Sequence, residues 1–246
     1  MRFYLGAPEP HWLGLLDVPM FVSYRRLRLQ LRTKIPKARV PWAMDSGGFT
    51  ELGLYGKWKT SVDEYIEGVN YFATEIGQLE WAAPQDWMCE PDMLEKTGLS
   101  VREHQERTVD NYLLLRDKGP FIPVLQGWEI DDYLECIDLY AQAGVELGAE
   151  PVVGIGSVCR RQNDGRTVDL FNELVKNGIR SHGFGVKVTG LEGYGDKMVS
   201  ADSMAWTVTA LYRKPLPGCS HKHCTACIRY AVRWWSKVVG DYLAPN

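Results

Sequence analysis

The sequence lacks long hydrophobic runs. No segment approaches the roughly 18 apolar residues of a membrane-spanning helix, and the first ten residues, MRFYLGAPEP, contain no apolar stretch as long as that of a secretory signal peptide. We therefore expect a cytoplasmic protein with no membrane partner. Cysteine is sparse, with six among 246 residues. In a chain expected to be cytoplasmic, these predict thiols or metal ligands and not disulfides.

The sequence also lacks an internal repeat, a low-complexity segment and a Gly-rich dinucleotide-binding motif after its first predicted strand. The last absence argues against a Rossmann domain. The composition is that of an ordinary globular protein, with 45% hydrophobic and 24% charged residues. The length suits one large domain or two small ones, and it is close to that of a minimal (β/α)8 barrel.

Short apolar segments alternate with helical patterns along the chain. Amphipathic helices are predicted at 61–77, 101–117, 130–143, 165–177 and 225–240, with short or irregular helices after the first two strands. Eight strands alternating with helices predict a closed parallel α/β barrel, and an open doubly wound sheet is the alternative. The predicted strands are Arg2–Gly6, Met20–Tyr24, Pro41–Met44, Glu80–Pro84, Phe121–Gln126, Pro151–Gly156, His182–Lys187 and Val199–Asp202.

The best internal boundary is the Pro- and Gly-rich segment Lys214–Gly218. We expect a (β/α)8 catalytic domain over residues 1–214. Residues 215–246 are then predicted to form a metal-binding loop and a C-terminal helix that packs on the barrel.

Polar residues collect where the predicted strands end. Because the carboxyl ends of parallel barrel strands share one rim, three carboxylates, one amide and one ammonium are expected to converge there. Each alone is also an ordinary turn or cap residue. Together they predict an active site at the barrel mouth. The residues are Asp45 in Asp45-Ser46-Gly47-Gly48-Phe49, Asp86, Gln126 before Gly127, Lys187 and Asp202, beside the Gly154-Ile155-Gly156-Ser157 turn.

The types of residue at this rim limit its chemistry. The sequence contains no Ser–His–Asp signature, and no histidine stands at a predicted strand end in a metal-ligand pattern. Carboxylates without a metal suit chemistry at an anomeric carbon, where one attacks and another transfers the proton. Phe49 and Phe184 are placed to sandwich a planar heterocycle, with core packing as the alternative for each.

Positive charge is clustered although the net charge is −3. Residues 25–39 contain seven basic residues and no acidic one. Such a run is either a solvated helix face or a patch that contacts phosphates. A second basic face, Arg229, Arg233 and Lys237, follows from the i, i+4, i+8 spacing in the last predicted helix. The run comprises Arg25, Arg26, Arg28, Arg32, Lys34, Lys37 and Arg39.

The segment 219–227 reads CSHKHCTAC. Three cysteines and two histidines at this spacing predict a zinc site. Cys219, Cys224 and Cys227 are the expected ligands, with His221 or His223 as the fourth. Four protein ligands close the coordination shell, so the zinc is expected to be structural.

Taken together, these motifs resemble those of the tRNA-guanine transglycosylase superfamily. The resemblance lies in Asp45-Ser46-Gly47-Gly48-Phe49, in Gln126-Gly127, in Ala201-Asp202-Ser203 and in the segment from Cys224 into the following helix. The chain is more similar to the short DNA-modifying branch, the DpdA-type proteins. That likeness rests on WAAPQDWMCEP at 81–91, HGFGVK at 182–187 and GCSHKHC at 218–224.

The resemblance implies a base exchange in which guanine in DNA is replaced by a 7-deazaguanine of the preQ0 type. Asp202 is then the nucleophile at C1′, and Asp45 is the general acid and base. The implied substrate-binding residues are Asp86, Gln126, Gly127, Gly156, Ser46, Phe49, Phe184 and Lys187. Asp86 reads the N1–H and amino group of guanine, Gln126 and backbone near Gly156 read O6, and the two rings stack on the base.

The same resemblance favours His221 over His223 as the fourth zinc ligand. It leaves the group at position 7 of the base open, with Lys187, Ser157 and Arg160 as rim candidates. The target base is expected to be flipped or single-stranded. A second copy of the chain or accessory proteins are further candidate partners. The alternatives are the same exchange on tRNA, a hydrolytic DNA base glycosylase, and a non-catalytic zinc-bearing nucleic-acid-binding barrel.

Overall fold

A computed structural model describes residues 1–30, 35–161 and 165–243. Eight parallel strands form one sheet in the order β4-β3-β2-β1-β8-β7-β6-β5. The first and last strands pair directly, and a parallel bridge between Ala82 and Phe121 joins the two ends of the sheet. The predicted barrel is thereby confirmed. The strands are β1 (Arg2–Gly6), β2 (Met20–Ser23), β3 (Trp42–Asp45), β4 (Leu79–Ala82), β5 (Val124–Leu125), β6 (Val153–Ile155), β7 (Ser181–Gly183) and β8 (Ser200–Ser203).

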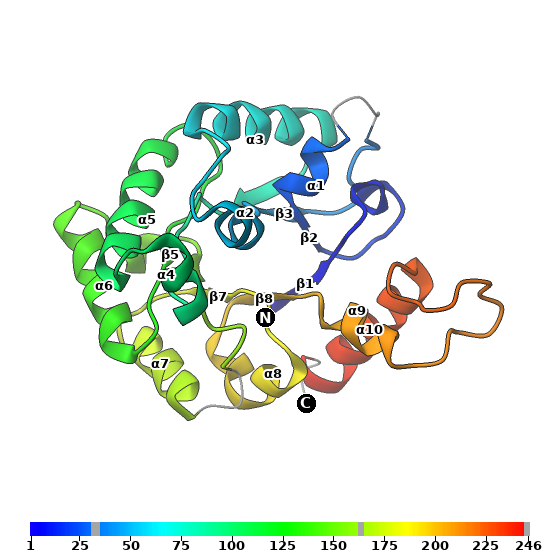
Figure 1. Ribbon diagram of the computed structural model, residues 1–246. Helices are drawn as coiled ribbons and strands as arrows, with labels where there is room; N and C mark the ends of the chain where they lie inside the picture. The colour runs from blue at the N-terminus through cyan, green and yellow to red at the C-terminus, as the bar shows by residue number, and fades with distance from the viewer. Residues whose placement is uncertain (31–34, 162–164, 244–246) are drawn as a thin grey trace.

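Helices surround the sheet, as Figure 1 shows in a view toward one end of the barrel. The long ones follow the predicted periodicity. They are α3 (Val62–Ile76), α5 (Val101–Leu115), α6 (Ile130–Gln142), α7 (Gly165–Lys176) and α10 (Ile228–Tyr242). The short ones are α1 (Tyr24–Arg28), α2 (Gly48–Tyr55), α4 (Pro91–Thr97), α8 (Val188–Tyr194), α9 (Ala205–Leu211) and the 3₁₀ turns η1 (Pro10–Gly14), η2 (Leu147–Ala149) and η3 (Gly195–Lys197).

The predicted starts of two long helices are confirmed. Ser61 caps α3 by accepting the backbone N–H of Glu64. Ser100 and Glu103 form a reciprocal capping box at the start of α5. Each cap satisfies backbone donors that a helix start otherwise leaves without an intrahelical partner.

Three strands have half of their predicted length or less, and one of them is β6, which covers Val153–Ile155 of the predicted Pro151–Gly156. Only Val124–Leu125 of the predicted strand Phe121–Gln126 belongs to β5, and Phe121 makes the isolated bridge. The predicted strand His182–Lys187 corresponds to β7, which ends at Gly183. Gly185 then adopts a φ of 62°, a left-handed conformation that turns the chain out of the strand.

One core cluster lies inside the barrel and forms the floor under its mouth. It comprises Tyr4, Phe21, Ala43, Trp81, Ile122 and Val152, with Phe184 packed against it. His182 is fully buried among these side chains, with ring centroids 4.7 Å from Trp81 and 4.9 Å from Phe184. Such dense aromatic packing fills the interior beneath the mouth.

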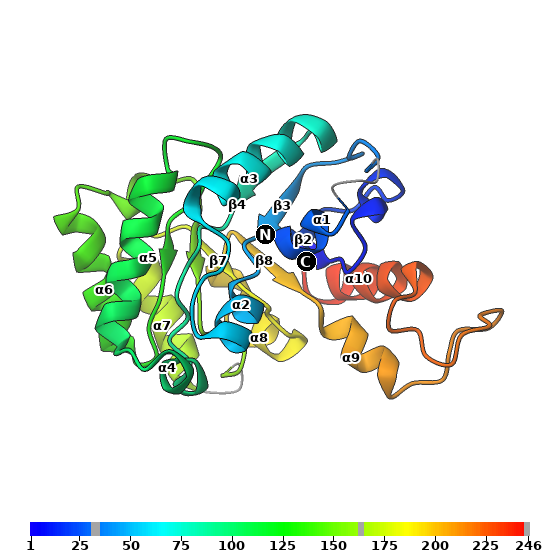
Figure 2. The same ribbon diagram turned by 45° about the horizontal axis from the view of Figure 1, so that its top comes forward.

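The C-terminal helix α10 packs against the first strand of the barrel. The indole of Trp235 donates a hydrogen bond to the carbonyl of Phe3 at 2.9 Å, and the rings of Phe3 and Trp234 lie 6.1 Å apart. Figure 2 shows the loop that follows α9 extending away from the sheet. None of the helices in the described ranges combines the length and apolar character needed to cross a membrane.

Candidate active site and metal-ligand cluster

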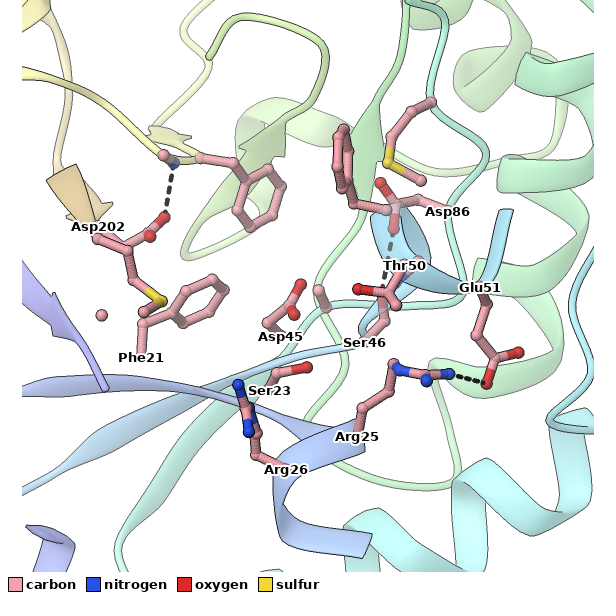
Figure 3. Close-up of a pocket in the computed structure, with 18 of the residues that line it drawn as sticks. Phe21, Ser23, Arg25, Arg26, Asp45, Ser46, Thr50, Glu51, Asp86 and Asp202 are labelled. Carbon is pink, nitrogen blue, oxygen red and sulfur yellow. Dashed lines mark hydrogen bonds and ion pairs between the residues drawn. The ribbon is translucent and has the colours of Figure 1, made fainter. Parts of the chain in front are cut away.

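A cavity of about 750 Å³ opens at the carboxyl ends of the strands. Its wall contains all three carboxylates that the sequence places at the rim. Figure 3 shows Asp45, Asp86 and Asp202 around the same space, with Arg25 and Arg26 at its edge. The sequence-predicted residues that line it are Asp45, Ser46, Phe49, Asp86, Gly156, Ser157, Phe184, Asp202, Arg25, Arg26 and Arg28.

Asp45 is the last residue of β3, and its carboxylate accepts the backbone N–H of Gly47 at 3.1 Å. Gly47 has a φ of 84°, and a Cβ there would lie 2.6 Å from the side chain of Arg25. The turn therefore requires glycine. Burial raises the pKa of Asp45 to about 6, against hydrogen bonds from Ser23 and Gly47 and with a smaller contribution from the charge of Asp202. Such a pKa suits a group that gives and takes a proton near neutral pH.

Asp86 lies in the loop after β4 and is buried. Its carboxylate accepts hydrogen bonds from Ser46 Oγ at 3.3 Å and Gln126 Nε2 at 2.6 Å. Burial raises the pKa of Asp86 to about 7, with a further increase from the charge of Asp45 and against the hydrogen bonds from Gln126 and Ser46. The charge of Asp45 opposes the ionisation of Asp86, so Asp86 ionises less easily while Asp45 is charged.

Gln126 stands behind Asp86 and does not line the cavity. Its carbonyl oxygen lies 2.9 Å from the hydroxyl of Ser157, which in turn lies 2.9 Å from the carboxyl of Glu90. A Cβ on Gly156 would lie 2.2 Å from the amide of Gln126. Glycine at 156 is therefore what allows Gln126 to reach Asp86.

Asp202 lies on β8 and faces the cavity from the opposite side (Figure 3). Its Oδ1 accepts the backbone N–H of Gly185 at 2.9 Å and lies 3.4 Å from Nε2 of His182. The other ring nitrogen of His182 is 2.8 Å from Ser200 Oγ. Burial lowers the pKa of His182 more than Asp202 raises it, so the ring is neutral. These contacts fix the orientation of the Asp202 carboxylate.

Two aromatic rings line the cavity in different settings. Phe49, on α2, is 47% exposed, and the guanidinium of Arg160 lies 5.2 Å from its ring centroid. Phe184 is half-buried and stacks on Phe21 at 5.9 Å with an interplanar angle of 26°. Phe184 therefore combines core packing with a place in the wall, whereas Phe49 is free to contact a ligand.

Besides Gln126, two residues expected to bind substrate, Lys187 and Gly127, do not line the cavity. Lys187 is exposed at the N-cap of α8, because the chain leaves β7 at Gly183 and turns at Gly185. Gly127 faces the other way, since a Cβ there would lie 2.9 Å from the ring of Tyr133.

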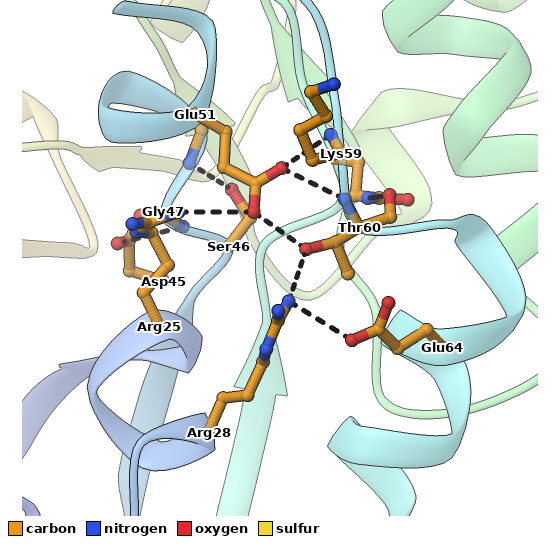
Figure 4. A network of polar contacts seen from close by, with 11 residues as sticks. Arg25, Arg28, Asp45, Ser46, Gly47, Glu51, Lys59, Thr60 and Glu64 are labelled. Carbon is orange, nitrogen blue, oxygen red and sulfur yellow. Dashed lines mark hydrogen bonds and ion pairs between the residues drawn. The ribbon is translucent and has the colours of Figure 1, made fainter. Parts of the chain in front are cut away.

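The basic residues at the mouth are held by buried acceptors. Arg25 lies 3.3 Å from Glu51, and Arg28 donates to Thr60 at 3.0 Å. Glu51 is 2% exposed and accepts the hydroxyl of Thr60 at 2.7 Å. Figure 4 shows this network joining α1, α2 and the segment before α3. Arg26 lines the cavity beside it.

The rest of the basic run has other positions. Lys37 donates to the carbonyl of Thr74, and Arg39 pairs with Asp17 at 2.8 Å. Arg32 and Lys34 lie outside the described residues. Within the described residues, the part of this run that lines the mouth is the three arginines of α1.

The cysteine-rich loop brings four metal-ligand atoms together. The ligand atoms of Cys219, His221, Cys224 and Cys227 lie within 4.8 Å of one another, and these residues can hold a metal ion. His221 Nε2 is 3.1 Å from Cys224 Sγ. His223 is not part of this group. None of the four lines the cavity at the barrel mouth, so a metal here is separate from the carboxylates.

Arg229 and Arg233, two of the three basic residues predicted in the last helix, lie on α10. Arg229 donates to the carbonyl of Pro217 at 3.2 Å and lies 3.8 Å from Cys219 Sγ. Arg233 lines a second cavity, of about 580 Å³, between α8, α9 and α10. Neither residue lines the first cavity.

Sequence reasoning missed three polar residues that shape this site: Glu51, Glu90 and His182. Glu90 lies four residues after Asp86, and its closeness to a predicted rim residue could have indicated it. The partners of the other two are distant in the chain, since 26 residues separate Glu51 from Arg25 and 20 separate His182 from Asp202. Such contacts are set by the closed barrel and not by any local pattern.

Fold and site define a parallel α/β barrel with a carboxylate-rich cavity at its mouth and a cysteine–histidine cluster after the last strand. A family model described as "DpdA: DeoxyPurine in DNA protein A" matches residues 1–244. The chain belongs to this family. Membership implies a protein of DNA deoxypurine modification with DNA as its substrate. No curated protein matches the chain.

Proposed function

We propose that the protein exchanges guanine in DNA for a 7-deazaguanine base through a covalent intermediate on Asp202. The observation that carries this proposal is the meeting of Asp45, Asp86 and Asp202 in one cavity of a DpdA-family barrel. Two of the three carboxyls have raised pKa values, which suits proton transfer. An enzyme of this kind is a pentosyltransferase.

The proposed first step forms a bond between Asp202 and C1′ while the bond from C1′ to N9 of guanine breaks. Both fixed contacts of Asp202 engage Oδ1, so we assign the attack to Oδ2. Asp45 gives its proton to the departing guanine. In the second step Asp45 takes a proton from the incoming base, whose nitrogen attacks C1′ and releases Asp202. Two inversions give net retention at C1′.

Asp86 is proposed to recognise the base. Guanine presents N1–H and its amino group side by side, and a carboxylate can accept both hydrogen bonds. Ser46 and Gln126 orient the Asp86 carboxylate from behind. Phe49 and Phe184 offer the apolar surfaces for stacking.

The proposed DNA contacts follow from the position of α1. A base must leave its stack to enter a cavity at a barrel mouth, so the target nucleotide is flipped or single-stranded. Arg25, Arg26 and Arg28 stand at the edge where the flanking phosphates would lie. Arg229 and Arg233, which lie outside this cavity, are proposed as additional phosphate contacts.

The metal held by the cysteine-rich loop is proposed to be zinc. Three thiolates and one imidazole are a common tetrahedral zinc set, and four protein ligands leave no open position for catalysis. In this proposal the metal fixes the loop before α10, and it takes no part in the base exchange.

The decisive experiment is to trap the intermediate. Incubating the protein with guanine-containing DNA and denaturing the mixture should give a covalent protein–DNA adduct. Asp202→Ala should abolish the adduct, whereas Asp196→Ala, at an exposed carboxyl on η3, should form it as the wild type does. An adduct that still forms with Asp202→Ala would falsify the nucleophile assignment.

Labelled 7-deazaguanine bases then identify the nucleic acid and the reaction. We expect incorporation into DNA and not into tRNA. Release of guanine without incorporation of the labelled base indicates a hydrolytic glycosylase. A non-catalytic binding protein would show no difference between the wild type and Asp45→Ala or Asp202→Ala in any of these measurements.

A further inference from the structure

Glu90 is a buried carboxyl in the wall of the active-site cavity that the proposed exchange does not use. It immediately precedes α4, is 2% exposed, and lines the same cavity as Asp86 and Asp202. Burying a carboxyl carries a free-energy penalty unless it has partners or a function. Its Oε2 contacts the hydroxyl of Ser157 at 2.9 Å, and its Oε1 has a weak contact with the thiol of Cys159 at 4.0 Å. Oε1 therefore retains accepting capacity.

The position of Glu90 relative to the base follows from a chain of hydrogen bonds. Asp86 contacts Gln126, Gln126 contacts Ser157, and Ser157 contacts Glu90. Around the edge of a guanine ring, the amino group and N1–H are followed by O6 and then by position 7. In the proposed function, Asp86 contacts the amino group and N1–H of the base. Glu90 is at the other end of this series of hydrogen bonds, so it lies on the side of position 7.

The Gly156-Ser157 turn holds this arrangement in place. Ser157 has a φ of 56°, an uncommon conformation for a residue other than glycine. Its hydroxyl also accepts the backbone N–H of Cys89 at 2.8 Å. A strained backbone conformation fixed by several contacts is a frequent feature of binding sites. The turn thus ties Glu90 to the wall that faces the base.

The hydrogen-bond pattern defines what Oε1 can do in either protonation state of Glu90. If Glu90 is ionised, both of its oxygens accept. If it is protonated, its proton on Oε2 is donated to Ser157, whose own proton then goes to Gln126 Oε1, and Oε1 of Glu90 is a carbonyl oxygen. Burial favours the second state by raising the pKa of Glu90. With the proton on Oε2, Oε1 is an acceptor in both states.

We propose that Glu90 selects the substituent at position 7 of the incoming base, favouring one that carries N–H donors, such as an aminomethyl group, over a nitrile. A nitrile only accepts hydrogen bonds, so it would meet another acceptor at Oε1. The proposal rests on the proposed function for the identity of the base as a 7-deazaguanine. It departs from the preQ0-type base implied by the sequence resemblance, because preQ0 carries a nitrile.

The test compares the binding of two free bases, 7-aminomethyl- and 7-cyano-7-deazaguanine, to the full chain by calorimetry. We expect the wild type to bind the aminomethyl base about 10- to 100-fold more tightly, the range for a hydrogen bond that involves a charged group. Glu90→Leu should bring this ratio close to one. Glu90→Gln, which keeps an acceptor but cannot ionise, should retain an intermediate preference. Glu95→Leu, at an exposed carboxyl on α4, is the matched control and should keep the wild-type ratio.

Exchange of labelled guanine into DNA, measured on the same proteins, separates this inference from the proposed function. A wild type that exchanges guanine but binds both bases equally, or a Glu90→Leu variant that keeps the wild-type ratio, overturns the role of Glu90 alone. Absence of exchange together with the expected binding ratio overturns the exchange reaction and leaves the role of Glu90 standing. If neither base binds, the role of Glu90 is rejected whatever the exchange assay gives.

Discussion

At the scale of single residues, Asp45 and Asp86 have different tasks in the proposed reaction and correspondingly different needs. Asp86 recognises guanine by accepting two N–H groups, so it must be ionised when the base is bound. Asp45 has to carry a proton in one step and lose it in the next. Their pKa values of about 6 and about 7 place both titrations near neutral pH.

We expect the affinity for free guanine to increase as the pH rises through about 7. Below that pH, Asp86 is protonated in the empty cavity, and binding must first remove its proton. Calorimetry in two buffers of different ionisation heat should detect a proton released on binding near pH 6. Asp86→Asn should lower the affinity about 10- to 100-fold and remove this pH dependence. Equal affinity at pH 5.5 and pH 8 would contradict the role of Asp86.

Stability should change with pH for the same reason. Since burial raises both pKa values above that of an unfolded carboxyl, the folded state binds more protons between pH 4 and pH 7, and stability falls as the pH rises through that range. At pH 8, Asp86→Asn should therefore be more stable than the wild type, on the order of 1–2 kcal/mol. Asp138→Asn, at an exposed position, should change stability by less than about 0.5 kcal/mol. Urea denaturation at pH 5 and pH 8 measures both effects.

At the scale of elements, Glu51 joins three segments that form one side of the cavity. Its carboxylate accepts the backbone N–H groups of Lys59 and Thr60 at 2.8 and 3.1 Å, and it pairs with Arg25. Burial alone would raise the pKa of Glu51, but the hydrogen bonds from Thr60 and Lys59 outweigh it and lower the pKa. This contribution to stability is present above about pH 4.5 and is lost as the pH falls through the lowered pKa.

Replacing this carboxylate should loosen α2 and the adjacent loop together. Glu51→Ala leaves buried N–H donors and the hydroxyl of Thr60 without their acceptor, so we expect a loss of about 2–4 kcal/mol at pH 7. DNA binding should weaken as well, because Arg25 loses its partner. Glu67→Ala, at an exposed residue of α3, should be close to neutral. Denaturant midpoints that fall equally in the two variants would argue against this role of Glu51.

The elements also show how far the sequence determines the fold. The segments that became α3 and α5 were predicted because each keeps its apolar periodicity over a long stretch, which is 15 residues in the structure. The shorter α2 and α8, of eight and seven residues, were not predicted, because so few residues barely establish a helical period. The left-handed turn at Gly185 is equally invisible, and it is what moves Lys187 away from the cavity.

The site was predictable where the chain order alone brings residues together. Strand ends of a parallel barrel must meet at one rim, so Asp45, Asp86 and Asp202 could be placed there from the sequence. The pairing of Asp202 with His182 could not, since it depends on which side of β7 faces the interior. The same holds for Glu90, whose burial follows from the fold of the loop after β4.

At the scale of the whole molecule, α10 links the two sides of the barrel. Two of its residues, Ala231 and Val238, are buried in different core clusters, and Trp234 and Trp235 contact both. The metal-ligand loop leads directly into this helix, because Cys227 is its N-cap. A metal bound there therefore fixes the start of the helix that covers β1.

Metal removal should therefore destabilise the fold, but the cavity should still bind guanine. We expect one metal ion per chain by elemental analysis, and zinc as its identity. Chelation should lower Tm by roughly 5–10 °C, or about 2–3 kcal/mol for a chain of this length. Guanine binding should persist below the new Tm, because none of the four ligand residues lines the active-site cavity.

The two histidines of the loop give a matched pair for this test. His221 belongs to the ligand group and His223 does not. His221→Ala should therefore weaken metal binding about 10- to 100-fold and make the protein insensitive to chelator at a lowered Tm, whereas His223→Ala should keep the metal and the chelator response. The opposite outcome would move the fourth ligand to His223. If chelation abolished guanine binding well below Tm, the metal and the carboxylates would be coupled, and the purely structural role of the metal would have to be abandoned.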